Sequence, residues 1–265
     1  MELKDKIAIV TGGGQGIGRA IARLFAKEGA TVLIAGRTLR SLEETCSEIN
    51  TAGGEAYFVQ TDVSNESEVI RMVSETACRF GRIDILVNNS GISGPTVRVA
   101  AMDLSQWNET LAINLTGSML CAREVLKYMM PARSGSIVNI VSEAGRAGDG
   151  RAGYPMRSAY CSSKMGQIGL TETLAVEVGE YNIRVNAVSP GPIQGERIFR
   201  VVRKRSEATG AAFEDMLKDL SSNCSLKRLA TEEETAAVVL FLASDASSGV
   251  TGQTIPVSCG QHISF

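Results

Sequence analysis

The chain has 265 residues, 44% of them hydrophobic, and a formal net charge of −2. Such a chain can bury a large core, and its balanced charge excludes a general electrostatic attraction to nucleic acid or anionic membranes. The first residues, MELKDK, contain no apolar signal region, and no apolar run approaches the roughly 18 residues of a membrane span. We therefore expect a cytoplasmic protein without nucleic-acid or membrane partners.

The cysteines and the histidine narrow the chemistry further. Six cysteines are spread through the sequence without a C-x-x-C pair, which argues against a zinc site and against a disulfide scaffold. This cysteine usage is typical of a reducing compartment. The one histidine, His262, argues against a Ser-His-Asp hydrolase and against a histidine-rich metal enzyme, so we expect no metal.

Seven short apolar runs alternate along the chain with longer stretches of helical spacing. Most of these runs are rich in valine and isoleucine and lack alternating polar residues, which is typical of strands buried on both faces of a parallel sheet. The predicted strands are 6–10, 31–35, 55–60, 83–87, 135–141, 183–188 and, shorter, 254–257.

The stretches between the strands have helical spacing and recognisable ends. Three of them end at glycine or proline: 17–29 at Gly29, 67–81 at Gly81, and about 103–130 before Pro131. Thr231 to Glu234 reads T-E-E-E, which predicts a capping box at the start of the last helix.

Alternation of strands and helices throughout predicts a Rossmann-type, doubly wound parallel sheet of about seven strands with helices on both faces. No linker, repeat or low-complexity segment interrupts it, so we expect one dinucleotide-binding and catalytic domain over residues 1–265. A polar helical insertion at about 192–225 follows the sixth strand. Its position at the carboxyl edge of the sheet predicts a substrate lid.

Residues 11–18 read TGGGQGIG, directly between the first predicted strand and the first predicted helix. The pattern is G-x-x-x-G-x-G, with Gly12, Gly16 and Gly18 as its fixed points. Glycines there let the backbone approach a pyrophosphate, and the helix N-terminus supplies N–H donors. A tight strand-to-helix turn without a ligand is the alternative, but the flanking strand and helix favour dinucleotide binding.

The end of the second strand bears on the choice of cofactor. A carboxylate there would bind the ribose hydroxyls of NAD, but the strand ends Ala35-Gly36-Arg37. Arg37 is suited to a 2′-phosphate, so we favour NADP over NAD. An ordinary surface arginine at a helix start is the alternative.

Tyr160 and Lys164 form a Y-x-x-x-K, which places both side chains on one face of a helix. An ammonium beside a phenol favours the phenolate, which makes Tyr160 a usable acid/base for interconverting a hydroxyl and a carbonyl. Other polar motifs follow the carboxyl ends of predicted strands, where ligands bind in such sheets. They are Asn88-Asn89-Ser90-Gly91, Ser142 and Pro190-Gly191, while Asn114 lies in the long predicted helix.

Over essentially its whole length the sequence resembles the short-chain dehydrogenases/reductases, in the subgroup of about 250 residues. The family's T-G-x-x-x-G-I-G corresponds to Thr11–Gly18, and its D-V corresponds to Asp62-Val63. Its N-N-A-G appears as N-N-S-G at 88–91, and its P-G corresponds to Pro190-Gly191. Its Asn-Ser-Tyr-Lys tetrad corresponds to Asn114, Ser142, Tyr160 and Lys164. The chain departs from the family at two further positions. Gly195 stands where a threonine is common, and Gln15 stands where NADP users often have a basic residue.

The resemblance implies an NAD(P)-dependent enzyme that interconverts a secondary alcohol and a carbonyl by hydride transfer. Tyr160 would exchange the proton, Lys164 would bind the nicotinamide ribose, Ser142 would hold the substrate oxygen, and Asn114 would anchor a proton-relaying water. The cofactor-binding residues implied by the motifs are Gly12, Gln15, Gly16, Ile17, Gly18, Arg37, Asp62, Val63, Asn88, Gly91, Tyr160, Lys164, Pro190, Gly191 and Ile193.

Arginines gather around the predicted substrate mouth. Arg146, Arg151 and Arg157 lie in the long stretch between Ser142 and Tyr160, and Arg197 lies in the predicted lid. We hypothesise an anionic small-molecule substrate held by one or two of them. Interspersed acidic residues support the alternative of a solvated surface.

The resemblance also implies a homotetramer. An enoyl reductase is disfavoured because that group spaces its tyrosine and lysine more widely and residue 166, six after Tyr160, is glycine. A non-catalytic dinucleotide sensor or scaffold is the alternative from another class. Such proteins usually lack one member of the tetrad, and here all four candidates are present.

Overall fold

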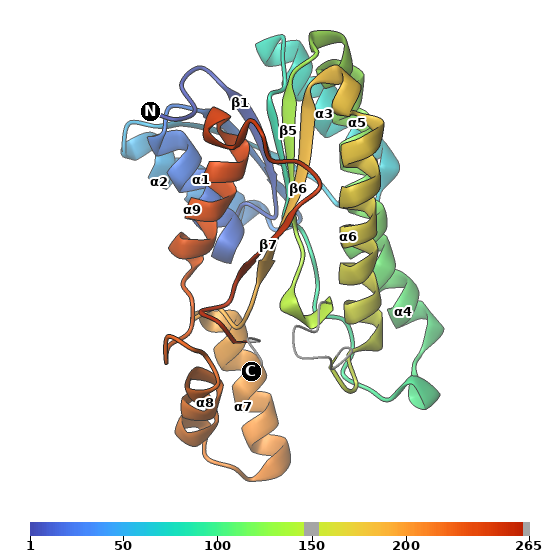
Figure 1. The fold of residues 1–265 in the computed structure, drawn as a ribbon, viewed down its shortest axis with the longest axis vertical. Coiled ribbons are helices and arrows are strands. Elements are labelled where there is room, and N and C mark those ends of the chain that lie inside the picture. Colours follow the sequence, from blue (N-terminus) through green and yellow to red (C-terminus); the bar gives the residue numbers. More distant parts are fainter. Residues whose placement is uncertain (146–153, 262–265) are drawn as a thin grey trace.

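A computed structural model of the chain describes residues 1–145 and 154–261. Its seven strands form one parallel sheet in the order β3-β2-β1-β4-β5-β6-β7 (Figure 1). The strands are β1 (Ile7–Thr11), β2 (Thr31–Gly36), β3 (Glu55–Gln60), β4 (Ile85–Asn88), β5 (Gly135–Ile140), β6 (Ile183–Pro190) and β7 (Thr254–Val257). All seven predicted strands and the predicted doubly wound parallel sheet are confirmed.

Helices cover both faces of the sheet, and each layer encloses its own apolar core (Figure 1). In β1, Ala8 and Val10 point into one core and Ile9 into the other, because successive side chains of a strand face opposite ways. The first layer contains α1 (Gly16–Lys27), α2 (Leu39–Thr51) and α9 (Glu232–Ala243). The second contains α3 (Glu66–Phe80), α5 (Gly117–Ala132) and α6 (Ser158–Glu177).

The edge strand β3 differs from the sequence prediction. It was expected to be buried on both faces, but this is wrong, since the strand is partly exposed. Phe58, for example, is 38% exposed. β3 has a neighbouring strand on one side only, which a run of apolar residues in the sequence does not reveal.

The predicted helix from 103 to 130 is a composite. It consists of α4 (Leu104–Leu111), a π-helical turn (Ala112–Thr116) and α5. Pro131 does not end it as expected. The helix includes Pro131 and runs to Ala132, and it stops where Arg133 adopts a left-handed conformation with φ of 49°.

The predicted helix ends are otherwise confirmed. Gly29 follows α1 with a positive φ, Gly81 caps α3, and Thr231 and Glu234 make both hydrogen bonds of the capping box of α9. The segment after β6 forms α7 (Glu196–Thr209) and α8 (Phe213–Ser222), which lie beyond the carboxyl edge of the sheet (Figure 1). No helix among the described residues is both long and apolar enough to span a bilayer.

Candidate active site

The glycine-rich loop joins β1 to the N-terminus of α1. Gly12 and Gly16 have φ of 65° and 56°, in the left-handed region that favours glycine. A Cβ on Gly18 would overlap the carbonyl oxygen of Gly12 and Asn89 Nδ2. Gln15 occupies the N-cap position, and its side chain makes no capping hydrogen bond in the described part of the chain. The loop therefore has the open backbone and the helix N-terminus that suit a dinucleotide pyrophosphate.

The loops that follow β1 and β4 are tied together by two side chains. The hydroxyl of Thr11 accepts hydrogen bonds from the backbone N–H groups of Asn89 and Ser90, each at 3.0 Å. Asn89 Nδ2 donates back to the carbonyl oxygens of Thr11 and Gly12, at 3.0 and 3.2 Å. Asn89 thus fixes the glycine loop. This role was missed from the sequence, because the pairing of β1 with β4 is not readable there.

Asn88 and Gly91 occupy different places relative to the site. The Asn88 side chain is buried and donates to Asn139 Oδ1 (2.9 Å) and to the Ser118 carbonyl oxygen (3.2 Å), so it faces the interior. Its implied contact with a cofactor stays a prediction, and the side-chain amide donor already has protein acceptors. A Cβ on Gly91 would lie 3.2 Å from Asn114 Oδ1 and 3.7 Å from Lys164 Nζ, so Gly91 lies close to two members of the predicted tetrad.

Arg37 lies at the carboxyl end of β2 beside a shallow pocket. The pocket is lined by Arg37, Gln60, Asp62, Glu68 and Arg71. Arg37 NH1 lies 4.0 Å from Asp62 Oδ2, and Arg71 donates to the Gln60 carbonyl oxygen at 2.9 Å. The sequence did not single out Arg71, because its approach to Arg37 depends on how α3 packs beside β3.

The remaining implied cofactor residues lie near this edge of the sheet. Val63 is buried, with its side chain packed against Gly117 of α5. After β6, the Gly191 N–H donates to the Val257 carbonyl oxygen at 3.0 Å. Ile193 forms a bridge with Ala230. The loop that starts at Pro190 is therefore held against β7 and the entry to α9.

Glu232, the first residue of α9, brings a carboxylate to the glycine loop. A Cβ on Gly16 would lie 3.5 Å from Glu232 Oε1, and one on Gly195 would lie 3.0 Å from it. Burial raises the pKa of Glu232, Glu233 raises it further, and Arg19 acts in the opposite direction. In the sequence, Glu232 stands out only as part of the T-E-E-E cap of this helix.

Asn114 lies in the π-helical turn and is fully buried. Its Oδ1 accepts from the Ile92 N–H at 2.8 Å, and its Nδ2 donates to the Ile92 carbonyl oxygen and to Ser163 Oγ, both at 3.0 Å. The side chain therefore fastens the loop after β4 to α6. A π turn is frequent at functional sites because it displaces a helical residue from its regular position.

Lys164 is buried and points its ammonium at two acceptors. Nζ donates to the Ile140 carbonyl oxygen and to Gln167 Oε1, both at 2.7 Å. Gln167 Nε2 donates to Ser118 Oγ (2.6 Å), which donates to the Asn114 carbonyl oxygen (3.0 Å). Hydrogen bonds through Gln167 and Ser118 thus connect Lys164 to Asn114. The resemblance implied a proton-relaying water between these two residues. Gln167 was not identified from the sequence.

Ser142 and Tyr160 complete the tetrad. Ser142 closely follows β5, and its Oγ accepts from the Ala144 N–H at 3.2 Å. Tyr160 lies in the first turn of α6 and is 8% exposed, and Lys164 Nζ lies 6.0 Å from the centre of its ring. Next to Ser142, the buried Glu143 accepts a hydrogen bond from Ser189 Oγ at 2.5 Å. The tetrad residues therefore converge at the carboxyl edge of the sheet.

The four candidate substrate arginines are placed unequally. Arg146 and Arg151 lie outside the described residues, and Arg197 lies in the first turn of α7, where its side chain is not described. Arg157 is described. It occupies the N-cap position of α6, and its Cζ lies 4.9 Å from the centre of the Tyr160 ring.

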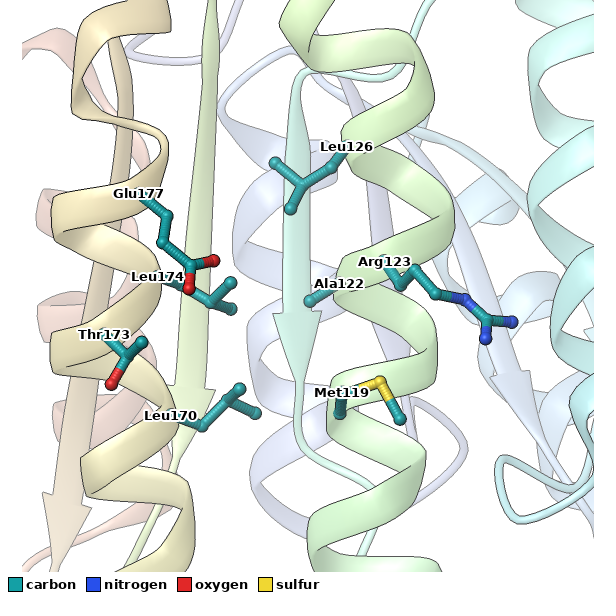
Figure 2. A pocket seen from close by; sticks show the side chains of 8 residues that line it. All are labelled: Met119, Ala122, Arg123, Leu126, Leu170, Thr173, Leu174 and Glu177. Atoms are coloured by element: carbon teal, nitrogen blue, oxygen red, sulfur yellow. The ribbon is translucent and has the colours of Figure 1, made fainter.

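A separate groove runs between α5 and α6, away from the catalytic edge (Figure 2). Its walls are mainly apolar and carry one charged residue from each helix, Arg123 and Glu177. The lining residues are Met119, Ala122, Arg123, Leu126, Leu170, Thr173, Leu174 and Glu177. On α6 itself, Val176 is 84% exposed and Met165 is 49% exposed. Such a surface is typical of a contact between subunits.

Comparison with known proteins identifies the class to which this fold and this site belong. The family model described as "Enoyl-(Acyl carrier protein) reductase" matches residues 12–262. The chain belongs to the short-chain dehydrogenases/reductases, a family of oxidoreductases.

Individual relatives show the range of that family. The cis-4-hydroxycyclohexanecarboxylate dehydrogenase of Sinomonas cyclohexanicum is 35% identical over 256 residues, covering 97% of this chain and 96% of the relative. The structure of NAD⁺-bound xylitol dehydrogenase matches with a TM-score of 0.92 and 32% identity over 98% of this chain and 100% of its own. The structure of a variant of actinorhodin polyketide ketoreductase with NADPH matches with a TM-score of 0.91 and 31% identity over 98% of both chains.

Proposed function

We propose that the chain interconverts a secondary alcohol and a carbonyl compound, with Tyr160 as the acid/base and a nicotinamide dinucleotide as the second substrate. The observation that supports this most directly is the placement of Tyr160 and Lys164 on consecutive turns of α6, with the ammonium 6.0 Å from the ring centre. A relative whose name describes the oxidation of a hydroxyl compound adds to this support. The dinucleotide, when bound, supplies or accepts the hydride.

The chain's own residues handle the proton and the substrate oxygen. Tyr160 holds the proton at Oη and gives it to the oxygen of a carbonyl, or takes it from a hydroxyl in the reverse direction. Lys164, held by the Ile140 carbonyl and Gln167, places its ammonium on the same side of α6 as the phenol. Ser142 donates a hydrogen bond to the same substrate oxygen.

Two other activities are less well supported. The family model bears the description of an enoyl reductase, but the Y-x-x-x-K spacing at Tyr160 and Lys164 differs from the wider spacing of that group. A dinucleotide sensor or scaffold needs no acid/base, whereas all four tetrad residues are present here.

The substitution Tyr160→Phe separates an enzyme from a sensor. We expect turnover of secondary alcohols or of their ketones to fall by about three orders of magnitude or more, because the proton donor is lost. Cofactor affinity, measured by nicotinamide fluorescence, should stay within about twofold of wild type. A Phe variant that turns over its substrate at the wild-type rate would contradict the proposed role of Tyr160.

For the cofactor we propose a preference for NADP, supported by Arg37 at the end of β2 and by Arg71 on the rim of the same pocket. Asp62, 4.0 Å from Arg37, opposes it by partly neutralising the charge. Titration with NADH and NADPH should show tighter NADPH binding. Arg37→Ala should weaken NADPH binding about tenfold or more and leave NADH binding unchanged, since only NADPH carries a 2′-phosphate on its adenosine ribose.

Arg40 provides the matched control for this titration. It is an exposed arginine three residues along that already pairs with Glu44 at 2.8 Å. Arg40→Ala should leave both affinities unchanged. Tighter NADH binding that is indifferent to Arg37 would overturn the phosphate contact and indicate NAD as the cofactor.

We further propose that the chain forms one catalytic domain with α7 and α8 as a substrate lid, and that it works as a cytoplasmic homotetramer. The groove between α5 and α6 supports subunit contact, because its apolar walls would be covered there (Figure 2). Leu170→Glu should shift the mass measured by light scattering towards smaller species. A wild-type protein that is monomeric at micromolar concentration would contradict the tetramer.

A further inference from the structure

Arg157 places a cation at the catalytic tyrosine. Its Cζ lies 4.9 Å from the centre of the Tyr160 ring, and its Nε is buried with no hydrogen-bond acceptor in the described part of the chain. Among the residues that the structure describes, its guanidinium makes neither a hydrogen bond nor an ion pair. Several other arginines of the chain pair with carboxylates: Arg19, Arg40, Arg82, Arg123 and Arg228.

A guanidinium whose buried Nε has no hydrogen-bond acceptor indicates that an acceptor is missing. A buried donor without a partner costs free energy, so native proteins rarely leave one unsatisfied unless a ligand or water completes it. Stacking on an aromatic ring satisfies the face of the guanidinium but leaves its in-plane N–H groups free. Those N–H groups form a fork that fits the two oxygens of a carboxylate, or two oxygens of a sulfonate.

The surroundings of Arg157 also point to an anionic group. Ser158 Oγ, the next residue along, is likewise buried and has no partner within residues 1–145 and 154–261. Lys164 adds a second positive charge near Tyr160. The buried carboxylate next in the chain to Ser142, that of Glu143, is engaged by Ser189 on β6 rather than by Arg157.

The position of Arg157 restricts where the anionic group sits on the substrate. The hydroxyl or carbonyl that reacts must reach Tyr160 Oη, and the guanidinium lies beside the ring that carries this oxygen. An oxyanion bound to Arg157 is therefore only a few bonds from the reacting carbon. A short separation between the two groups fits the 4.9 Å between Cζ and the ring centre best.

We propose that Arg157 binds an oxyanion group of the substrate, a carboxylate or a sulfonate, close to the hydroxyl that is oxidised or the carbonyl that is reduced. The inference rests on the proposed function, since it places the substrate at Tyr160. It makes the substrate a short hydroxy acid or hydroxy sulfonate, or the corresponding oxo compound. Arg157 is then a specificity-determining residue.

The test measures binding rather than turnover and uses three probes of similar shape. Cyclohexanecarboxylate, cyclohexanesulfonate and the neutral cyclohexanecarboxamide are titrated into the full-length protein saturated with whichever of NADH and NADPH binds more tightly, following nicotinamide fluorescence. We expect the wild type to bind one of the anions at least about tenfold more tightly than the carboxamide. The better anion identifies the oxyanion.

Variants assign the preference to Arg157. Arg157→Gln should reduce it to less than about twofold, and Arg157→Lys should keep part of it, because the charge remains and the fork is lost. Arg79→Gln is the matched control. Arg79 is stacked on Tyr57, with Cζ 3.6 Å from the ring centre, in the last turn of α3, and its loss should leave the preference intact.

The possible outcomes separate the two proposals. Equal binding of all three probes by the wild type, or an unchanged preference in Arg157→Gln, overturns the role of Arg157 and leaves the reaction class standing. A wild-type protein that binds neither NADH nor NADPH overturns the proposed function and this inference with it. Cofactor binding by each variant, measured first, shows that the variant is folded.

Discussion

Gly18 offers a sharp test of the glycine loop, because helix propensity and packing predict opposite effects of adding a methyl group. Gly18 lies inside α1, where alanine normally stabilises a helix over glycine by about 1 kcal/mol. In this structure, however, a Cβ at Gly18 would overlap the Gly12 carbonyl oxygen and Asn89 Nδ2. We expect Gly18→Ala to destabilise the protein.

The size of the loss follows from the contacts that must move. Overpacking by one methyl group costs about 1–3 kcal/mol. Displacing Asn89 also breaks its hydrogen bonds to the carbonyl oxygens of Thr11 (3.0 Å) and Gly12 (3.2 Å), each worth about 1 kcal/mol. After the gain in helix propensity, the free energy of unfolding should fall by about 2–4 kcal/mol.

Urea denaturation of the cofactor-free protein, followed by circular dichroism, measures this change. Gly169→Ala is the matched control, since Gly169 lies inside α6 and a Cβ there meets no described atom within 4 Å. The control should gain about 1 kcal/mol. Gly18→Ala should also bind the cofactor more weakly, because the loop that faces the pyrophosphate is distorted. If Gly18→Ala is as stable as Gly169→Ala, the steric argument fails.

Three further predictions concern residues around this edge. Glu232→Gln should tighten cofactor binding severalfold at neutral pH and remove the pH dependence of that binding. Burial raises the pKa of Glu232, so the wild type loses cofactor affinity and stability as the pH rises through that pKa. Parallel pH profiles of the wild type and the variant would contradict this. Gln167→Leu removes a hydrogen-bond acceptor of the Lys164 ammonium, so it should lower kcat about tenfold with little change in KM for a secondary alcohol. A change in KM alone would contradict a role of Gln167 at Lys164. Glu234→Gln should cost about 0.5–1 kcal/mol of stability in urea at pH 7. Arg228 and the Thr231 N–H lower the pKa of Glu234 to about 2, so this difference should vanish as the pH falls from 4 towards 2, and a constant difference would argue against the ion pair.

The predictions that succeeded rest on local chemistry. Buried parallel strands leave uninterrupted apolar runs, so β1, β2 and β4 to β6 are visible in the sequence as segments. The capping box of Thr231 and Glu234 needs only residues three apart. The tetrad stays a prediction, and it could be proposed from the sequence because its residue types are the ones that the proposed chemistry requires.

The predictions that failed, and the residues that were missed, depend on packing between distant segments. The sequence of β3 resembles that of a buried strand, and its edge position is known only once the strand order is known. Asn88 and Asn89 are adjacent and chemically alike. Only the pairing of β4 with β1 and β5 decides that Asn88 faces Asn139 while Asn89 holds the glycine loop.

Arg71 and Gln167 were missed for the same reason. Arg71 reaches the rim of the pocket beside Arg37 through the approach of α3 to β3, and Gln167 reaches Lys164 one turn further along α6. Neither belongs to a motif with a recognisable spacing. Residues 103–130 were predicted as one continuous helix, and the π turn was missed because an apolar pattern does not reveal one extra residue in a helix.

That extra residue constrains how the chain can change in length. Removing one residue between 112 and 116 would restore a regular helix and leave α4 and α5 in their present register, because the π turn accommodates its extra residue locally. Thr110 would keep its contact with Gly94 in the loop after β4, but Asn114 would lose the displaced position from which it bonds Ile92 and Ser163. A single deletion at this junction would therefore leave both helices in place and still release the loop after β4 from α6, because Asn114 is the residue that joins them.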